Sequence, residues 1–169
     1  MDPQTALLVV VPEAEQAVAR HRARLDRAAA WGVPAHVTVL YPFLPPDRID
    51  AGELRELFAG LPRFVARLDR VGWFGDRVAW LAPEPADRFR ELTETVWRRY
   101  PQAPPFEGAF DDVVPHLTVG HDHPRAVLAA AADDAAGRLP ITFEVRSVRL
   151  ITGRTGVRPW RTVTEFPLG

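Results

Sequence analysis

The segments AHVTVL (residues 35–40) and PHLTVG (residues 115–120) repeat one local pattern, His-apolar-Thr-Val, at corresponding points of the two halves of the chain. The chain has five histidines, and the two in these segments, His36 and His116, stand 80 positions apart. A single histidine in a strand often occurs by chance, whereas two histidines in the same four-residue pattern indicate a duplicated unit. The pattern therefore predicts two related strands that serve one site.

Each motif sorts its side chains onto two faces if it forms a strand. Successive side chains of a β-strand point to opposite faces, so His36 and Thr38 share one face, as do His116 and Thr118. The apolar residues that alternate with them are typical of a face that packs under helices. The other face places an imidazole and a hydroxyl about 7 Å apart along each strand.

The order of predicted elements around the two motifs also repeats, and two homologous lobes explain it most simply. In each half a strand precedes a helix, the short motif strand, a second helix and a longer strand. The predicted elements are residues 6–11, 13–31, 36–40, 51–59 and 64–73, then 78–82, 87–100, 116–119, 125–138 and 141–151, with a last strand at 160–166. We expect one domain with lobes at about 1–76 and 77–169, and the pattern leaves open an exchange of strands between them.

Short glycine-containing turns at residues 72–77 and 153–156 favour antiparallel hairpins over parallel crossovers. The predicted fold class is therefore α+β, with two curved antiparallel sheets flanked by helices and related by a pseudo-twofold axis. Such an axis brings the two motifs to opposite walls of a central cleft. His36 and His116 then face each other.

The composition is that of a soluble globular protein of 169 residues, with 47% hydrophobic and 25% charged residues. The formal net charge of −1 argues against duplex DNA as a partner, although a local basic cleft suits a short phosphorylated ligand. The absence of cysteine excludes disulfides and thiolate chemistry. The segment MDPQTALLVVVPE lacks a basic region and a membrane-spanning apolar run, so we expect a cytoplasmic monomer without membrane contact.

Two imidazoles and two hydroxyls around one point are the groups that an in-line reaction at phosphorus requires. One histidine takes a proton from the attacking oxygen, and the other gives a proton to the leaving oxygen. The threonine hydroxyls bind the non-bridging oxygens of the phosphate. Imidazole titrates near neutral pH, so neither role demands an extreme pKa.

The sequence resembles the two-histidine phosphoesterase superfamily, whose best-known branch contains 2′-5′ RNA ligases and RNA 2′,3′-cyclic phosphodiesterases. The resemblance rests on the stretches GVPAHVTVLYPFLPP, VGWFGDRVAWLAPEP, VVPHLTVGH and VRPWRTVTEFPLG, which together span nearly the whole chain. It implies a bilobal fold and chemistry at phosphodiesters with a 2′ oxygen, without a metal or other cofactor. It also implies that His36 is the proton donor and His116 the acceptor that activates water, with Thr38 and Thr118 on the phosphate.

Side chains near the motifs are further candidates for substrate contact. Tyr41 and Phe43 follow the first motif, where an exposed ring stacks on a nucleobase or packs in the core. Arg154 and Arg158, in the turn before the last strand, either reach a phosphate or are solvated.

The remaining histidines carry weaker signals. His116, His121 and His123 form a poor metal site, because His116 and His121 are expected to face opposite sides and only Asp122 offers a nearby carboxylate. We expect His121 and His123 to be solvent-exposed turn residues and His21 to be a solvated residue on a helix. No metal site is predicted.

Two classes of function follow from the sequence. The first is an enzyme that opens a 2′,3′-cyclic phosphate or a related small nucleotide or RNA-end phosphodiester, with 2′-5′ RNA ligation as a variant of the same chemistry. The second is a non-catalytic nucleotide or RNA-end binding module with the same fold. Two intact His-x-Thr motifs favour the enzyme, since a pure binder has no need for two opposed titratable groups. The low net charge disfavours ligation of long RNA.

Overall fold

A computed structural model describes residues 2–109, 112–157 and 159–169. The strands are β1 (Gln4–Val10), β2 (His36–Leu40), β3 (Phe64–Phe74), β4 (Val78–Glu84), β5 (Leu117–His121), β6 (Ile141–Val145), β7 (Ser147–Gly153) and β8 (Arg161–Pro167). The helices are α1 (Glu15–Leu25), α2 (Arg27–Ala30), α3 (Ala51–Ala59), α4 (Ala86–Arg99) and α5 (Arg125–Ala136), with 3₁₀ turns at Pro12–Ala14, Pro46–Arg48 and Pro105–Gly108. Within these described residues, no helix has the length and apolarity to cross a membrane.

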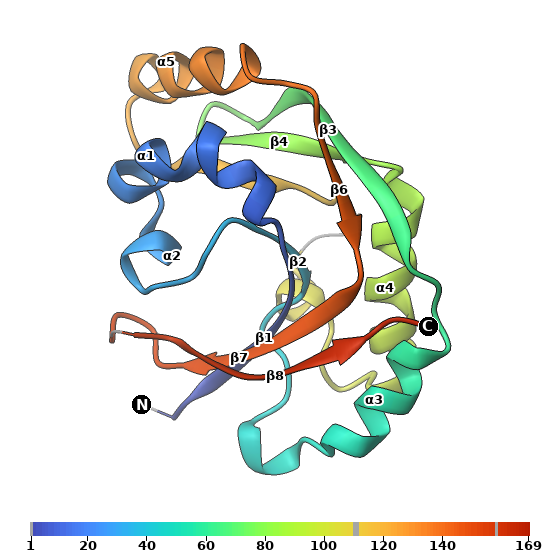
Figure 1. Cartoon of the computed structure of the whole chain (residues 1–169). Coiled ribbons are helices and arrows are strands. Elements are labelled where there is room, and N and C mark those ends of the chain that lie inside the picture. Colours follow the sequence, from blue (N-terminus) through green and yellow to red (C-terminus); the bar gives the residue numbers. More distant parts are fainter. Residues whose placement is uncertain (1, 110–111, 158) are drawn as a thin grey trace.

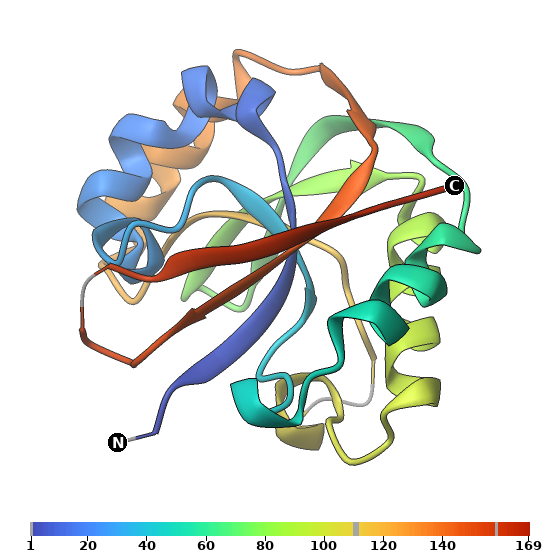
Figure 2. The same ribbon diagram turned by 60° about the horizontal axis from the view of Figure 1, so that its bottom comes forward.

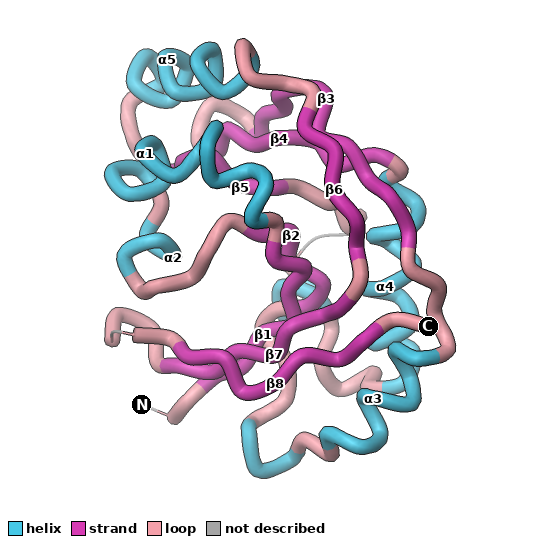
Figure 3. The backbone as a smooth tube through the Cα atoms, viewed as in Figure 1, coloured by secondary structure: helices cyan, strands magenta, loops and turns pink. Residues whose placement is uncertain are grey.

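The strands form two four-stranded antiparallel sheets, which confirms the predicted α+β fold class (Figure 1). The first sheet has the order β2-β1-β7-β8, and the second has the corresponding order β5-β4-β3-β6. The hairpins β3–β4 and β7–β8 are antiparallel, as the glycine turns predicted. Each sheet contains strands from both halves, 1–76 and 77–169, because β3 pairs with β4 while β7 and β8 return to β1. The tube in Figure 3 shows this arrangement of strands in magenta.

The helices cover the outer faces of the sheets in two pairs, α1 with α5 and α3 with α4 (Figure 2). Helix α1 follows β1 of the first sheet but packs on β5 of the second sheet. Helix α4 follows β4 of the second sheet but packs on β2 of the first sheet. The Thr93 hydroxyl of α4 donates a 2.7 Å hydrogen bond to the Val39 carbonyl of β2. This crossed packing ties the two sheets into one core.

The predicted helix over residues 13–31 is wrong in one respect, because the structure divides it into α1 and α2. The break falls at Asp26, whose backbone is extended (φ −127°, ψ 114°). Its carboxylate accepts hydrogen bonds from the Ala28 backbone N–H (3.1 Å) and from Arg22 Nε (2.9 Å). An aspartate that caps a new helix gives the backbone an alternative to continuing the old one.

The predicted single strand over residues 141–151 is also wrong, because the chain leaves the second sheet after β6 and enters the first as β7. Arg146 separates the two strands, and its carbonyl accepts a hydrogen bond from the Leu168 N–H (2.8 Å). The alternation slips by one residue here, since the apolar residues fall at odd positions through Val145 and at even positions at Val148 and Leu150. The slip marks the break, but a period of two cannot reveal which sheet each strand joins.

Two glycines allow a tryptophan ring to lie directly on a strand. A Cβ atom at Gly72 would stand 2.3 Å from the Trp80 ring, and one at Gly153 would stand 2.4 Å from the Trp160 ring. Both rings are buried, Trp80 at 6% and Trp160 at 8% exposure. The two sheets thus use the same device, a glycine beneath an indole.

Replacing Gly72 or Gly153 by alanine should destabilise the protein by about 1–3 kcal/mol, the usual cost of overfilling a packed site. Urea unfolding monitored by circular dichroism measures this change. Gly137→Ala is the matched control, since its nearest neighbour, the Asp134 carbonyl oxygen, is 3.5 Å from the added Cβ. Equal stability of all three variants would contradict the close packing described here.

Candidate active site

Strand β2 presents the first motif on one face, next to β1. His36 and Thr38 are half-buried and pair in register with Val10 and Leu8. Val37 and the other alternate residues of β2 are buried on the opposite face. The burial pattern confirms the predicted division of this strand into a buried face and a partly exposed face that carries His36 and Thr38.

The second motif has the same arrangement at the start of β5. His116 immediately precedes the strand and Thr118 lies within it, and both are half-buried. Leu117 and Val119 are fully buried on the other face. The two tetrapeptides therefore share a burial pattern as well as a sequence pattern.

A matching hydrogen bond orients each imidazole. Nδ1 of His36 lies 2.8 Å from the Pro34 carbonyl oxygen, and Nδ1 of His116 lies 2.8 Å from the Val114 carbonyl oxygen. A carbonyl oxygen only accepts, so Nδ1 carries the hydrogen in both rings. The Nε2 atom of each ring is left to accept or donate a proton.

The two motifs lie close to one another. Strands β2 and β5 are in contact, and the charge of His116 contributes to lowering the pKa of His36. A central cleft in which both imidazoles meet one ligand stays a prediction, since the cavity described below is lined, among the motif residues, by His36 and Thr38.

Burial sets the pKa values of both histidines. Burial lowers the pKa of His36 to about 4; the Arg22 charge adds to this effect, while the Pro34 hydrogen bond and the Asp26 charge oppose it. Burial also lowers the pKa of His116, against the opposing effect of the Val114 hydrogen bond. Both rings therefore favour the neutral form in the ligand-free cleft, and a bound phosphate anion favours the charged form of either.

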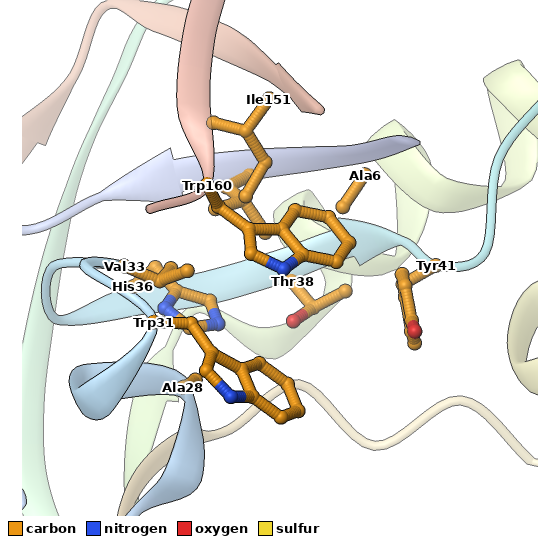
Figure 4. A pocket seen from close by; sticks show the side chains of 10 residues that line it. Ala6, Ala28, Trp31, Val33, His36, Thr38, Tyr41, Ile151 and Trp160 are labelled. Carbon is orange, nitrogen blue, oxygen red and sulfur yellow. The ribbon is translucent and has the colours of Figure 1, made fainter. Parts of the chain in front are cut away.

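A cavity of about 120 Å³ opens beside the first motif (Figure 4). Roughly this volume suits a single aromatic ring, since a cavity of about 150 Å³ admits benzene. Its lining is apolar except for a few polar groups, and consists of Ala6, Leu8, Ala28, Trp31, Val33, His36, Thr38, Tyr41, Ile151 and Trp160.

Two indoles form opposite walls of this cavity, with His36 and Thr38 between them on β2 (Figure 4). The ring centroids of Trp31 and Trp160 are 6.4 Å apart and their planes differ by 17°. The backbone N–H of Trp160 donates to the Trp31 carbonyl over 2.8 Å, which links the two walls through the backbone. Tyr41 meets Trp160 edge to face at 6.2 Å.

The corresponding region beside His116 is filled by aromatic side chains. Phe74 lies edge to face against the His116 ring at 4.9 Å, and Trp80 lies 6.0 Å from it. The Trp80 ring covers Gly72, so it occupies space next to the motif. The two sides of the cleft therefore differ: the His36 side has room for a ring, and the His116 side holds rings of its own.

The sequence suggested four further residues as substrate contacts, and the structure describes three of them. Tyr41 lines the cavity, and its hydroxyl donates to Gln4 Oε1 over 2.8 Å. Phe43 is buried against Tyr100 and does not line the cavity. Arg154 is exposed, and its carbonyl accepts a hydrogen bond from Trp160 Nε1. Arg158 lies outside the described residues.

The other histidines depart from the sequence prediction in two of three cases. His21 is buried rather than solvated, and its Nε2 lies 2.6 Å from Asp134 on α5, because α1 packs against α5. His121 is half-buried at the end of β5 instead of exposed, while His123 is exposed as predicted. Among residues 2–109, 112–157 and 159–169, no group of three His, Asp or Glu side chains is arranged to hold a metal ion.

The profile of the 2′-5′ RNA ligase superfamily matches residues 10–156. The chain belongs to this superfamily. Both motifs fall inside the matched region, as do the strands on which they lie. Curated protein sequences gave no match.

Solved structures of similar fold cover nearly the whole chain of this superfamily member. The E. coli LigT protein in complex with 3′-AMP is 20% identical, covers 99% of both chains and superposes with a TM-score of 0.63. LigT with NADP⁺ is 18% identical, covers 99% of both chains and has a TM-score of 0.60. The protein TT0787 of Thermus thermophilus is 18% identical, covers 98% of this chain and 97% of its own, and has a TM-score of 0.60.

Sequence reasoning missed the two walls of the cavity. The sequence placed Trp160 only at the start of the predicted strand 160–166, and Trp31 only at the end of the predicted helix 13–31. The available signal was the Trp31-Gly32 pair, where Gly32 adopts φ +84° and follows α2 shortly before the motif strand begins at His36. A glycine that stops a helix just before a functional strand fixes where the preceding side chain points.

The depressed pKa of His36 predicts a specific dependence of stability on pH. The unfolded chain protonates His36 near pH 6.5 and the folded chain near pH 4, so stability should fall as the pH drops through this interval. His36→Asn lacks the titrating group and should lose less stability over the same interval. Urea unfolding at about pH 7 and about pH 5 measures both slopes.

The exposed His123, changed to asparagine, provides the control and should follow the wild-type slope. Parallel curves for the wild type and His36→Asn would show that burial does not depress the pKa of His36.

Proposed function

We propose that this chain is a phosphodiesterase that opens 2′,3′-cyclic phosphates, or hydrolyses related small nucleotide phosphodiesters, by paired-histidine acid–base catalysis without a metal ion. The observation that carries the proposal is the matched pair of imidazoles, each with Nδ1 bonded to a carbonyl and Nε2 left to move a proton. The superfamily and the similar solved structures support a phosphoesterase-type enzyme. We further propose that it acts as a monomer in the cytoplasm.

In the proposed reaction, His116 Nε2 takes a proton from water as the water oxygen forms a bond to phosphorus. The bond from phosphorus to one ribose oxygen breaks on the opposite side, and His36, in the charged form that the bound phosphate favours, gives that oxygen its Nε2 proton. The products are a phosphate monoester and a free ribose hydroxyl. Thr38 and Thr118 donate hydrogen bonds to the non-bridging oxygens as negative charge accumulates on them.

The asymmetry of the cleft supports this division of roles. In-line displacement at a cyclic phosphate places the ribose with the leaving oxygen and water on the far side. The ring-sized cavity lies beside His36, whereas Phe74 and Trp80 fill the region beside His116. A nucleoside in the cavity puts its ribose oxygens nearest His36, which makes His36 the acid and His116 the base.

Small nucleotides suit the cleft better than long RNA. The formal net charge is −1, so the chain carries no large excess of positive charge for a polyanion. The cavity walls offer aromatic faces to a base. The complexes of LigT with 3′-AMP and NADP⁺ are examples of small nucleotides held by a protein of this fold.

Incubation with 2′,3′-cyclic nucleotides, 2′-5′ dinucleotides and ADP-ribose cyclic phosphate, in excess chelator, tests the proposal directly. Phosphorus NMR resolves the products by regiochemistry. We expect ring opening to a single monoester with chelator present. Binding of the nucleotides without turnover would instead identify the chain as a binding module, and joining of RNA ends without hydrolysis would identify it as a ligase.

Single histidine substitutions should separate the two roles. The pH–rate profile of the wild type should be bell-shaped; His116→Ala should lose the acidic limb and His36→Ala the alkaline limb, each with a rate loss of roughly 10²–10⁴. A substrate with a good leaving group should restore His36→Ala far more than His116→Ala. Thr38→Val should slow the reaction without altering either limb, because the hydroxyl does not titrate in this range.

Steady-state kinetics measures these effects. Preferential rescue of His116→Ala would mean that the roles are reversed. Undiminished activity of either alanine variant would remove that histidine from the mechanism.

Trp31→Leu should weaken substrate binding more than it slows the chemical step. Stacking on an aromatic side chain is worth about 1–3 kcal/mol per base, so KM for 2′,3′-cyclic AMP should rise roughly tenfold or more. The change in kcat should be small, because the motif residues keep their own hydrogen bonds. Trp97→Leu, an exposed indole on α4, is the matched control. An unchanged KM in Trp31→Leu would place the base elsewhere.

A further inference from the structure

Two charged side chains near the cavity are almost completely buried. Arg22 is 3% exposed and Asp26 is 7% exposed, and Arg22 Nε donates to Asp26 Oδ2 over 2.9 Å. Arg22 Nη2 also donates to the Val33 carbonyl (3.0 Å), and Asp26 Oδ1 accepts from the Ala28 N–H (3.1 Å). These bonds hold the junction between α1 and α2 against the loop that leads into β2.

His121, at the end of β5, contacts this junction from the second sheet. Its Nδ1 lies 2.9 Å from Asp122 Oδ2, and its Nε2 lies 3.3 Å from the Arg27 backbone N–H and 3.4 Å from Asp26 Oδ1. In the neutral ring, Nδ1–H donates to Asp122 and Nε2 accepts from the Arg27 N–H. The Asp26 and Asp122 carboxylates raise the pKa of His121 and so favour the charged ring, which donates from Nε2 to Asp26 instead.

Asp122 strengthens the same connection. Its Oδ2 accepts a 2.9 Å hydrogen bond from the Arg27 guanidinium, and its Oδ1 lies 3.6 Å from Arg77 in the β3–β4 turn. Its backbone N–H donates to the Arg77 carbonyl over 2.9 Å, with φ at +55°. His121 and Asp122, here called the β5 clasp, thus hold the first turn of α2.

The helix that the clasp holds carries one wall of the cavity. Helix α2 has four residues; Ala28 lies within it and Trp31 directly follows it, and both line the cavity. A helix of this length has too few internal hydrogen bonds to fix its own position. At its far end the Trp31 carbonyl accepts a hydrogen bond from the N–H of Trp160, the residue before β8 of the first sheet. The clasp is the corresponding attachment to β5, the strand that carries Thr118.

We propose that His121 and Asp122 are positioning residues for the nucleoside part of the substrate. They hold the Trp31 wall at a fixed place relative to the phosphate-binding groups of β5. The nature of the ligand rests on the proposed function, whereas the placement of Trp31 by the clasp does not. The clasp residues make no hydrogen bond to either motif imidazole, because the Pro34 and Val114 carbonyls orient His36 and His116.

His121→Leu and Asp122→Gly each remove one half of the clasp, and glycine tolerates the positive φ at position 122. His121→Gln retains an acceptor for the Arg27 N–H. His123→Leu changes an exposed histidine two residues away and serves as the control. Three measurements compare these variants with the wild type: titration calorimetry with 3′-AMP, the same titration with inorganic phosphate, and the indole N–H resonances of Trp31 and Trp160 in ligand-free protein.

The clasp predicts that His121→Leu and Asp122→Gly bind 3′-AMP roughly tenfold more weakly, the worth of about one hydrogen bond to a charged group. Their affinity for inorganic phosphate should stay within about twofold of the wild type, because phosphate does not contact the Trp31 wall in this proposal and so loses no hydrogen bond. The Trp31 indole resonance should move in both variants, and His121→Gln should restore most of the 3′-AMP affinity. His123→Leu should match the wild type in every measurement.

Equal losses of 3′-AMP and phosphate affinity would overturn the proposal by showing that the clasp serves general stability. An unmoved Trp31 resonance in both clasp variants would overturn it as well. A wild type that turns over no cyclic nucleotide would refute the proposed function, while the Trp31 resonance would still decide whether the clasp places the wall.

Discussion

The constraint on which this structure depends is that each motif strand must bury one face and leave the other open. Val37 and Leu117 are fully buried, while His36 and His116 on the opposite faces are half-buried. The crossed packing of α4 on β2 and α1 on β5 meets the first requirement for both strands at once. The faces that carry His36 with Thr38 and His116 with Thr118 are then left partly open.

The two motif histidines share the same orienting hydrogen bond but have different surroundings. The Nδ1–H bonds to Pro34 and Val114 repeat in both motifs, so the two imidazoles begin as equivalent groups. Their surroundings then differ. A ring-sized cavity adjoins His36, and Phe74 with Trp80 adjoins His116. In the proposed reaction, the packing around equivalent groups, rather than the groups themselves, assigns acid and base.

The sequence predicted the elements that are determined by local patterns of residues. The motif strand β2, the helix α3 and the two antiparallel hairpins arise from alternation, helical spacing and glycine turns within a few residues. It failed where distant contacts decide the outcome. The break at Asp26 depends on capping and on the pair with Arg22. The passage between sheets at Arg146 shifts the alternation by one residue, but that shift does not say which sheet the next strand joins.

The candidate site divides in the same way. His36 and His116 were evident because duplication makes a short motif informative. The Trp31 wall and the burial of His121 were not, since each requires residues about 90 to 130 positions apart to meet, as in the contact of Arg27 with Asp122 or of Trp31 with Trp160. Tyr41 and Phe43 show the same dependence, because the sequence left both between substrate stacking and core packing; in the structure Tyr41 lines the cavity and Phe43 packs on Tyr100.

The pairing of β1 with β7 has a consequence for how the chain is made. Gln4 lies opposite Gly153, so β1 waits during synthesis for a strand that leaves the ribosome much later. Contacts of such separation slow folding, because a long loop must close before any pairing stabilises it. Until then, the apolar run at residues 6–11 is an unpaired strand edge that invites aggregation. The first sheet is therefore completed only after β7 and β8 have emerged, and until then β2 is the partner of β1 on one edge while the other edge stays open.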